Sequence, residues 1–218
     1  MRVYHFLTAQ HGLENIELRR LKIARISELN DPFEWMARAE SERERAALRS
    51  LKEVQNKRTG LLCFSQNWQN PVQWTHYAER HRGICLGFDI HDENASAVGY
   101  RKTPIKFDVD RYTRDPDFAE KFSIALVTTK FLDWNYEREI RVFVRLDPAT
   151  EKKDGLYFYD FSDQLQLREI IVGAGSDVSR QQIDFAVKNK LEGLIIRKAR
   201  IAFNSYRIVE QNRRSLWK

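Results

Sequence analysis

The sequence Glu137-Arg138-Glu139-Ile140-Arg141-Val142-Phe143-Val144-Arg145-Leu146 has the clearest β-strand pattern of the chain. Successive side chains of a strand point to opposite faces, so Glu137 and Glu139 are expected to point the same way. Two like charges side by side are unfavourable unless cations or a substrate hydroxyl compensate them. The pair is therefore either a solvated strand face neutralised by the nearby arginines, or a set of two carboxylates that carries out chemistry.

Hydrophobic patterns around this strand predict an α+β protein with a mainly antiparallel central sheet and flanking helices. Further strands are expected at residues 3–8, 21–26, 61–65, 84–88, 100–107, 169–172, 194–197 and 206–209. Helices are expected at residues 9–19, 33–57, 115–131 and 179–190, and Ser179 and Gln182 have the spacing of a capping box. Because no repeat or linker divides the chain, a single domain over residues 1–218 is expected.

The composition is that of a globular protein: the chain has 218 residues, of which 42% are hydrophobic and 12% aromatic. No stretch approaches the ~18 apolar residues of a membrane span, and residues 1–6 have no signal-peptide pattern. A cytoplasmic protein without membrane association is therefore expected. Cys63 and Cys85 form no Cys-x-x-Cys pair, so neither a disulfide framework nor a bound metal is expected.

The formal net charge of +6 is concentrated at the C-terminal end of the chain. Residues 197–218 contain seven basic residues and one acid, Glu210, a difference equal to the whole excess. Tyr206 and Trp217 lie among these basic residues. A basic segment with aromatic residues favours nucleic acid as a partner, and a solubilising tail is the alternative.

His5 stands in an apolar strand pattern, on the same face as Val3 and Leu7. A histidine in such a place is most often a core residue. The alternative is a ring nitrogen that points into a cleft. Thr8, at the end of the same strand, is expected to cap the following helix.

Several motifs occur in an order that resembles a bacterial family known as domain of unknown function 2971. They are Tyr4-His5-Phe6 with Thr8, Leu29-Asn30-Asp31-Pro32-Phe33-Glu34, Cys63-Phe64-Ser65, Trp74-Thr75-His76-Tyr77-Ala78, Gly83-Ile84-Cys85-Leu86-Gly87-Phe88, Tyr100, and Trp134-Asn135-Tyr136-Glu137-Arg138-Glu139-Ile140-Arg141. The resemblance covers almost the whole chain. The family name implies no activity.

The strand-borne histidine, the serine-bearing strand with an aromatic residue after it, and the late Glu-x-Glu are also similar to ADP-ribosyltransferase-like enzymes. This resemblance implies that NAD binds against His5, Thr8, Ser65 and either Trp74 or Tyr77. His5 would hold the ribose, Ser65 would brace the site, and the aromatic ring would stack on nicotinamide. It further implies that Glu139 stabilises the transition state, while Glu137 orients or deprotonates the acceptor.

Three functional hypotheses follow. The first is an NAD-cleaving transferase that modifies a macromolecular acceptor, acting as a toxin or phage-defence effector with a neutralising partner protein. The second is a non-enzymatic module that binds nucleic acid or protein, in which Glu137, Glu139 and Arg141 form a structural charge network. The third is a metal-dependent nuclease that uses Glu137, Glu139 and Asp108.

Overall fold

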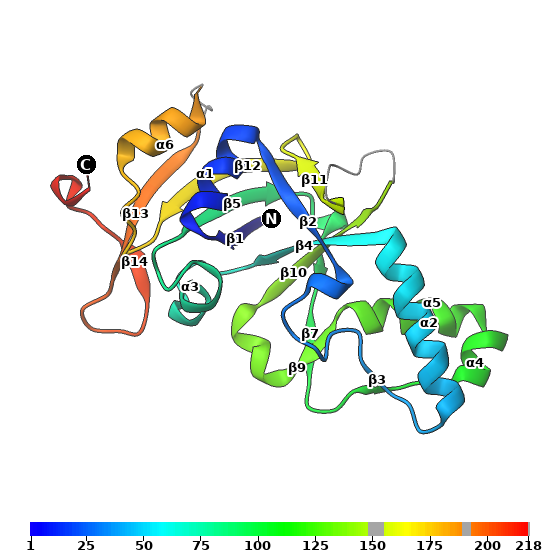
Figure 1. Ribbon diagram of the computed structural model, residues 1–218. Helices are drawn as coiled ribbons and strands as arrows, with labels where there is room; N and C mark the ends of the chain where they lie inside the picture. Colours follow the sequence, from blue (N-terminus) through cyan, green and yellow to red (C-terminus); the bar gives the residue numbers. More distant parts are fainter. Residues whose placement is uncertain (148–154, 189–192, 218) are drawn as a thin grey trace.

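The computed structural model describes residues 1–147, 155–188 and 193–217, and a large central sheet runs through it (Figure 1). The strands of this sheet are β1 (Arg2–Leu7), β2 (Arg20–Arg25), β4 (Thr59–Ser65), β5 (Ile84–Ile90), β6 (Ser96–Ala97), β10 (Glu139–Arg145), β11 (Tyr157–Asp160), β12 (Leu165–Val172), β13 (Ile195–Ile201) and β14 (Ile208–Glu210). Their order is β11-β2-β4-β1-β5-β12-β13-β14, with β10 paired to β4 and β6 paired to β10. Among the described residues of this sheet, only β12 and β13 pair in parallel. The predicted α+β class with a mainly antiparallel sheet is therefore confirmed.

Helices cover the sheet in two groups (Figure 1). Helices α1 (Ala9–Leu18) and α6 (Arg180–Val187) contact each other over one part of the sheet, and α3 (Pro71–Tyr77) lies beside β1. Helices α2 (Glu42–Arg58), α4 (Val109–Arg114) and α5 (Pro116–Val127) gather at the other end. Two small parallel pairs accompany this second group: β3 (Ala37–Arg38) with β8 (Ile105–Lys106), and β7 (Gly99–Arg101) with β9 (Thr129–Phe131). None of the helices among the described residues is long and apolar enough to cross a membrane.

Each helix group encloses its own apolar core. Under α1 and α6, Ile16 and Ile183 pack with the sheet residues Leu86 and Ile170. Under α2, α4 and α5, the buried side chains include Phe107, Phe122 and Leu126. A third core surrounds Trp74 of α3.

Two helices begin at the capping residues predicted from the sequence. Thr8 Oγ1 accepts a hydrogen bond from the backbone N–H of His11, so Thr8 caps α1 as expected. Ser179 and Gln182 form the predicted capping box of α6. The helix predicted over 179–190 ends at Val187, with Lys188 as its C-cap, and residues 189 and 190 lie outside the described part of the chain.

Several predicted boundaries are wrong. The strand predicted from Glu137 begins at Glu139, because residues 132–137 form the 3₁₀ helix η3 (Leu132–Glu137) and Arg138 has φ 45°. The helix predicted over 33–57 begins only after the Ser41 cap, because 33–38 form turns and β3. The strand predicted over 100–107 is two short strands, and the helix over 115–131 ends at Val127, before β9. Strand β11 was missed.

The two edges of β4 are paired differently. Along one edge, β10 pairs with β4 from Thr59 to Ser65. Along the opposite edge, β2 pairs only with Gly60 and Leu61, and β1 pairs only with Ser65. Residues 62–64 therefore have no strand partner on this edge among the described residues, and β1 and β2 diverge from each other there.

Candidate active site

A pocket of about 230 Å³ lies where β1 and β2 diverge. The predicted residues His5, Ser65, Tyr77, Glu137 and Glu139 all line it. They come from β1, β4, α3, η3 and β10, so the fold brings five separate elements together. The imidazole near the N-terminus and the two acids of the Glu-x-Glu motif thus face a common cavity.

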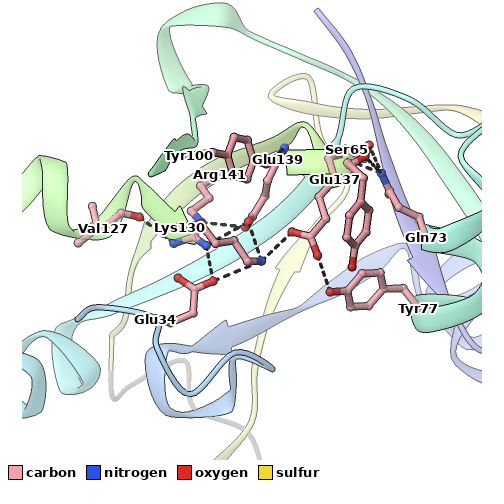
Figure 2. A network of polar contacts seen from close by, with 11 residues as sticks. Glu34, Ser65, Gln73, Tyr77, Tyr100, Val127, Lys130, Glu137, Glu139 and Arg141 are labelled. Atoms are coloured by element: carbon pink, nitrogen blue, oxygen red, sulfur yellow. Dashed lines mark hydrogen bonds and ion pairs between the residues drawn. The ribbon is translucent and has the colours of Figure 1, made fainter. Parts of the chain in front are cut away.

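Glu137 and Glu139 do not face the pocket through the alternation of a strand. Glu137 ends η3, Arg138 has left-handed backbone angles, and Glu139 begins β10. The side chain of Gln73, itself buried, donates to the backbone carbonyls of Tyr136 and Glu137 and to Ser65 Oγ, at 3.2, 3.1 and 2.9 Å. A polar anchor from α3 therefore holds the turn in place (Figure 2).

The two acids belong to a buried network of ion pairs (Figure 2). Lys130 Nζ lies 2.6 Å from Glu137, 3.2 Å from Glu139 and 3.4 Å from Glu34. Arg141, which has no exposed surface, lies 2.8 Å from Glu139 and 2.7 Å from Glu34. Three carboxylates and two cations leave the network with one excess formal negative charge. The solvated strand face considered from the sequence is wrong, because these side chains are at most 8% exposed.

The two carboxylates have different acidities. Burial disfavours the charge of Glu139, but Arg141 and Lys130 outweigh it and hold the pKa of Glu139 below its usual value. For Glu137 burial prevails over the stabilising contacts of Lys130 and Tyr77, so its pKa is raised. Tyr77 Oη donates to Glu137 Oε1 at 2.5 Å. The contacts of Glu139 therefore favour its charged form, whereas burial favours the protonated form of Glu137.

His5 is held by the backbone of β4. Its Nδ1 lies 2.8 Å from the carbonyl oxygen of Cys63, which can only accept, so Nδ1 carries the proton. Burial lowers the pKa of His5 and favours the neutral ring. The neutral ring then has Nε2 as a hydrogen-bond acceptor.

Two predicted residues lie away from the pocket. Thr8 is used as the cap of α1 and does not line the cavity. Trp74 is fully buried, donates to the carbonyl of Trp68, and packs against Phe6 and His81. The expectation that Trp74 stacks on a ligand is therefore wrong, and of the two aromatic candidates only Tyr77 reaches the pocket.

Sequence reasoning missed Lys130 and Glu34. Lys130 lies in β9, and its place depends on the parallel pairing of β9 with β7, where it is opposite Tyr100. Glu34 is turned inward by Asp31, whose backbone carbonyl accepts from the N–H of Glu34 at 3.0 Å. The one available signal was that Asp31 and Glu34 both lie in the sequence Leu29-Asn30-Asp31-Pro32-Phe33-Glu34.

Asp108 is not part of this site. It is exposed and caps α4, accepting from the N–H of Arg111 at 2.9 Å. The nuclease hypothesis that joined Asp108 to Glu137 and Glu139 is therefore wrong in its ligand set. No group of three or more His, Cys, Asp or Glu side chains within the described ranges has the arrangement of a metal site.

The fold and the pocket define an α+β protein with a net acidic, buried charge network at a sheet opening. Its residues 73–142 match the model of a family described as "Protein of unknown function (DUF2971)". The match supports the resemblance to this family noted from the sequence motifs, and it includes Tyr77, Lys130, Glu137, Glu139 and Arg141. No curated protein and no solved structure matches the chain.

Proposed function

We propose that this protein is an ADP-ribosyltransferase-like enzyme that cleaves NAD between nicotinamide and ribose and transfers ADP-ribose to a macromolecular acceptor. The observation that supports this most is that His5 and the Glu137–Glu139 pair line one pocket, as such an enzyme requires. Cleavage of this bond builds positive charge on the ribose. A preorganised carboxylate stabilises that charge most effectively in a site shielded from water.

The charge of the network suits this chemistry. The nicotinamide ring of NAD is a cation before cleavage, and the ribose becomes cationic during it. A network with one excess formal negative charge attracts both species, whereas a balanced network would favour neither.

Different pKa values assign different roles to the two acids. Glu139 stays ionised and stabilises the developing charge. Glu137 accepts the proton of the attacking group, and Tyr77 keeps its carboxylate oriented. His5, through Nε2, accepts a hydrogen bond from a ribose hydroxyl.

The volume of the pocket indicates which part of NAD enters it. About 230 Å³ is below the ~300–1,000 Å³ of sites that enclose a whole drug-sized ligand. The nicotinamide ring and its ribose therefore occupy the pocket, and the adenylate half lies outside it.

The test is nicotinamide release from NAD by the purified protein. Glu139→Gln keeps the shape but removes the charge, so turnover should fall by about 10²-fold or more. Glu120→Gln, an exposed acid of α5, is the matched control and should retain full turnover. NAD should also raise the melting temperature of the wild type, and less so that of His5→Ala. Unchanged NAD cleavage in Glu139→Gln would overturn the proposal.

We also propose nucleic acid as the macromolecular partner. In the connection between β13 and β14, Phe203 and Tyr206 are 94% and 97% exposed, and Arg200 and Arg207 flank them. Neither arginine has an acidic partner among the described residues. Exposed aromatic rings beside arginines that pair with no acid suit the bases and phosphates of a single strand.

Part of the basic segment is used inside the protein. Arg197 pairs with Glu169 and Glu210, and Lys198 donates to the carbonyl of Ser176. Lys218 lies outside the described residues. Binding of a short oligonucleotide should therefore weaken with salt and depend on Phe203 and Tyr206. Salt-dependent binding without any NAD cleavage would instead favour the non-enzymatic module.

A further inference from the structure

Lys130 also lines a second pocket, which none of the residues predicted from the sequence reaches. Its volume is about 270 Å³. The walls come from the turn before β3, the connection between β7 and β8, and β9. The lining residues that matter below are Phe33, Met36, Arg101, Lys102 and Phe131.

The apolar part of this pocket is unusually open to solvent. Phe33 is 63% exposed, Met36 47% and Phe131 45%. Exposed apolar side chains that are scattered singly over a surface need no explanation, but three that cluster around one cavity are typical of a binding site. Two of the three are aromatic rings, which can pack against a flat ligand.

The rim of the pocket carries positive charge. Arg101 and Lys102 are exposed, and neither has an acidic partner in the part of the chain that the structure describes. The charge of Lys130 is already compensated by three carboxylates, so it adds little to this rim. A ligand that matches both the apolar side chains and the positive rim has a flat apolar ring with a negatively charged group next to it.

We propose that this second pocket binds one nucleotide unit, with its base against Phe33 and Phe131 and its phosphate beside Arg101 and Lys102. A second copy of this chain fits less well, because a positive rim would face another positive rim. The nucleotide has two possible sources: the adenylate half of NAD, whose nicotinamide end would lie in the first pocket, or the nucleic-acid acceptor. Binding itself does not depend on NAD cleavage, and only the choice of source rests on the proposed function.

The first experiment is calorimetric titration of the full-length protein with AMP and with adenosine. Phe131→Ala should weaken AMP binding by about tenfold, the effect of losing one stacking ring. The double variant Arg101→Gln, Lys102→Gln should bring the affinity for AMP close to that for adenosine and leave adenosine unchanged. Phe185→Ala removes a 72% exposed ring from α6 and is the matched control. It should bind AMP like the wild type.

All these side chains are exposed, so the variants should keep the melting temperature of the wild type. No AMP binding at millimolar concentration, or equal binding by Phe131→Ala, would overturn the inference. The same titration with saturating NAD identifies the source. Displacement of AMP, together with weaker NAD binding by Phe131→Ala, assigns the adenylate half. Retained AMP binding assigns a nucleotide of the acceptor. Intact AMP binding in a protein that never binds NAD would sustain this inference and overturn the proposed function alone.

Discussion

Tyr77 donates a hydrogen bond of 2.5 Å to the Oε1 atom of Glu137, across 60 residues of sequence. The contact joins α3 to the turn before β10 and is one of the influences that lower the pKa of Glu137 against its burial. The proton affinity of the proposed base is therefore adjusted by a residue from another element.

Replacing this tyrosine should shift the pH dependence of activity. In Tyr77→Phe the Glu137 carboxylate loses a donor, so its pKa rises further. Because the base acts in its ionised form, the acidic limb of kcat/KM for NAD should move to higher pH by about one pH unit. Tyr159→Phe, in β11, should leave the profile in place. A Tyr77→Phe profile that overlays the wild type would show that Glu137 is not the titrating base.

Removing the lysine of the network should destabilise the fold in a pH-dependent manner. Lys130→Met leaves three carboxylates with Arg141 alone, and breaking a buried ion pair costs about 3–5 kcal/mol. The folded protein would then take up a proton on Glu137, whose pKa is already raised. A carboxyl whose pKa is higher in the folded than in the unfolded protein stabilises the fold at low pH. This stabilisation is lost as the pH rises through the folded-state pKa. Urea unfolding should therefore show a smaller deficit at pH 5 than at pH 8.

A matched control for this variant is Lys106→Met, which removes an exposed lysine 3.4 Å from Glu40. Exposed pairs contribute about 0–1 kcal/mol, so the urea midpoint should hardly change. Equal deficits for Lys130→Met at both pH values would contradict the network described above.

Arg141 should be irreplaceable by lysine. Its guanidinium contacts Glu139, Glu34 and the carbonyl of Val127 from one fully buried position. A lysine cannot reproduce this planar set of donors, so Arg141→Lys and Arg141→Met should both lose about 3–5 kcal/mol of unfolding free energy. Arg145→Met, on the same strand but exposed, should lose less than about 0.5 kcal/mol. Rescue by lysine would mean that charge alone matters here.

Gln73 should affect both stability and chemistry. Gln73→Leu fills a similar volume but removes the donor to the backbone carbonyl of Glu137, whereas the carbonyl of Tyr136 keeps its hydrogen bond from Asn70. An unsatisfied buried group costs about 1–3 kcal/mol, and the turn that carries Glu137 loses its anchor. The melting temperature and the rate of NAD turnover should both fall. Gln181→Leu, at an exposed position, should change neither. A stable Gln73→Leu protein with full turnover would exclude this anchoring role.

Helix caps could be predicted from the sequence because they depend on residues that are close together in the chain. Thr8 and Ser179 were assigned as caps because a capping hydrogen bond closes within three residues. The position of Lys130 depends on the pairing of β9 with β7, and Glu34 has partners, Lys130 and Arg141, that lie far from it in the sequence; such contacts leave no periodic signal. Trp74 and Tyr77 are three residues apart on one short helix, yet Trp74 enters the core and Tyr77 the pocket. Trp74 packs against the rings of Phe6 and His81, which lie outside α3.

The separation of β1 from β2 along β4 makes the cavity a property of the main chain. Its lining includes Cys63 and Phe64, which lack a strand partner only on the edge of β4 that β1 and β2 share, and the imidazole of His5 is hydrogen-bonded to the Cys63 carbonyl there. A sequence that keeps this pairing of β1, β2 and β4 keeps the separation of the strands, while the side chains around it can differ. Ligand preference can therefore diverge among relatives without rebuilding the scaffold, and a shared architecture does not guarantee a shared substrate.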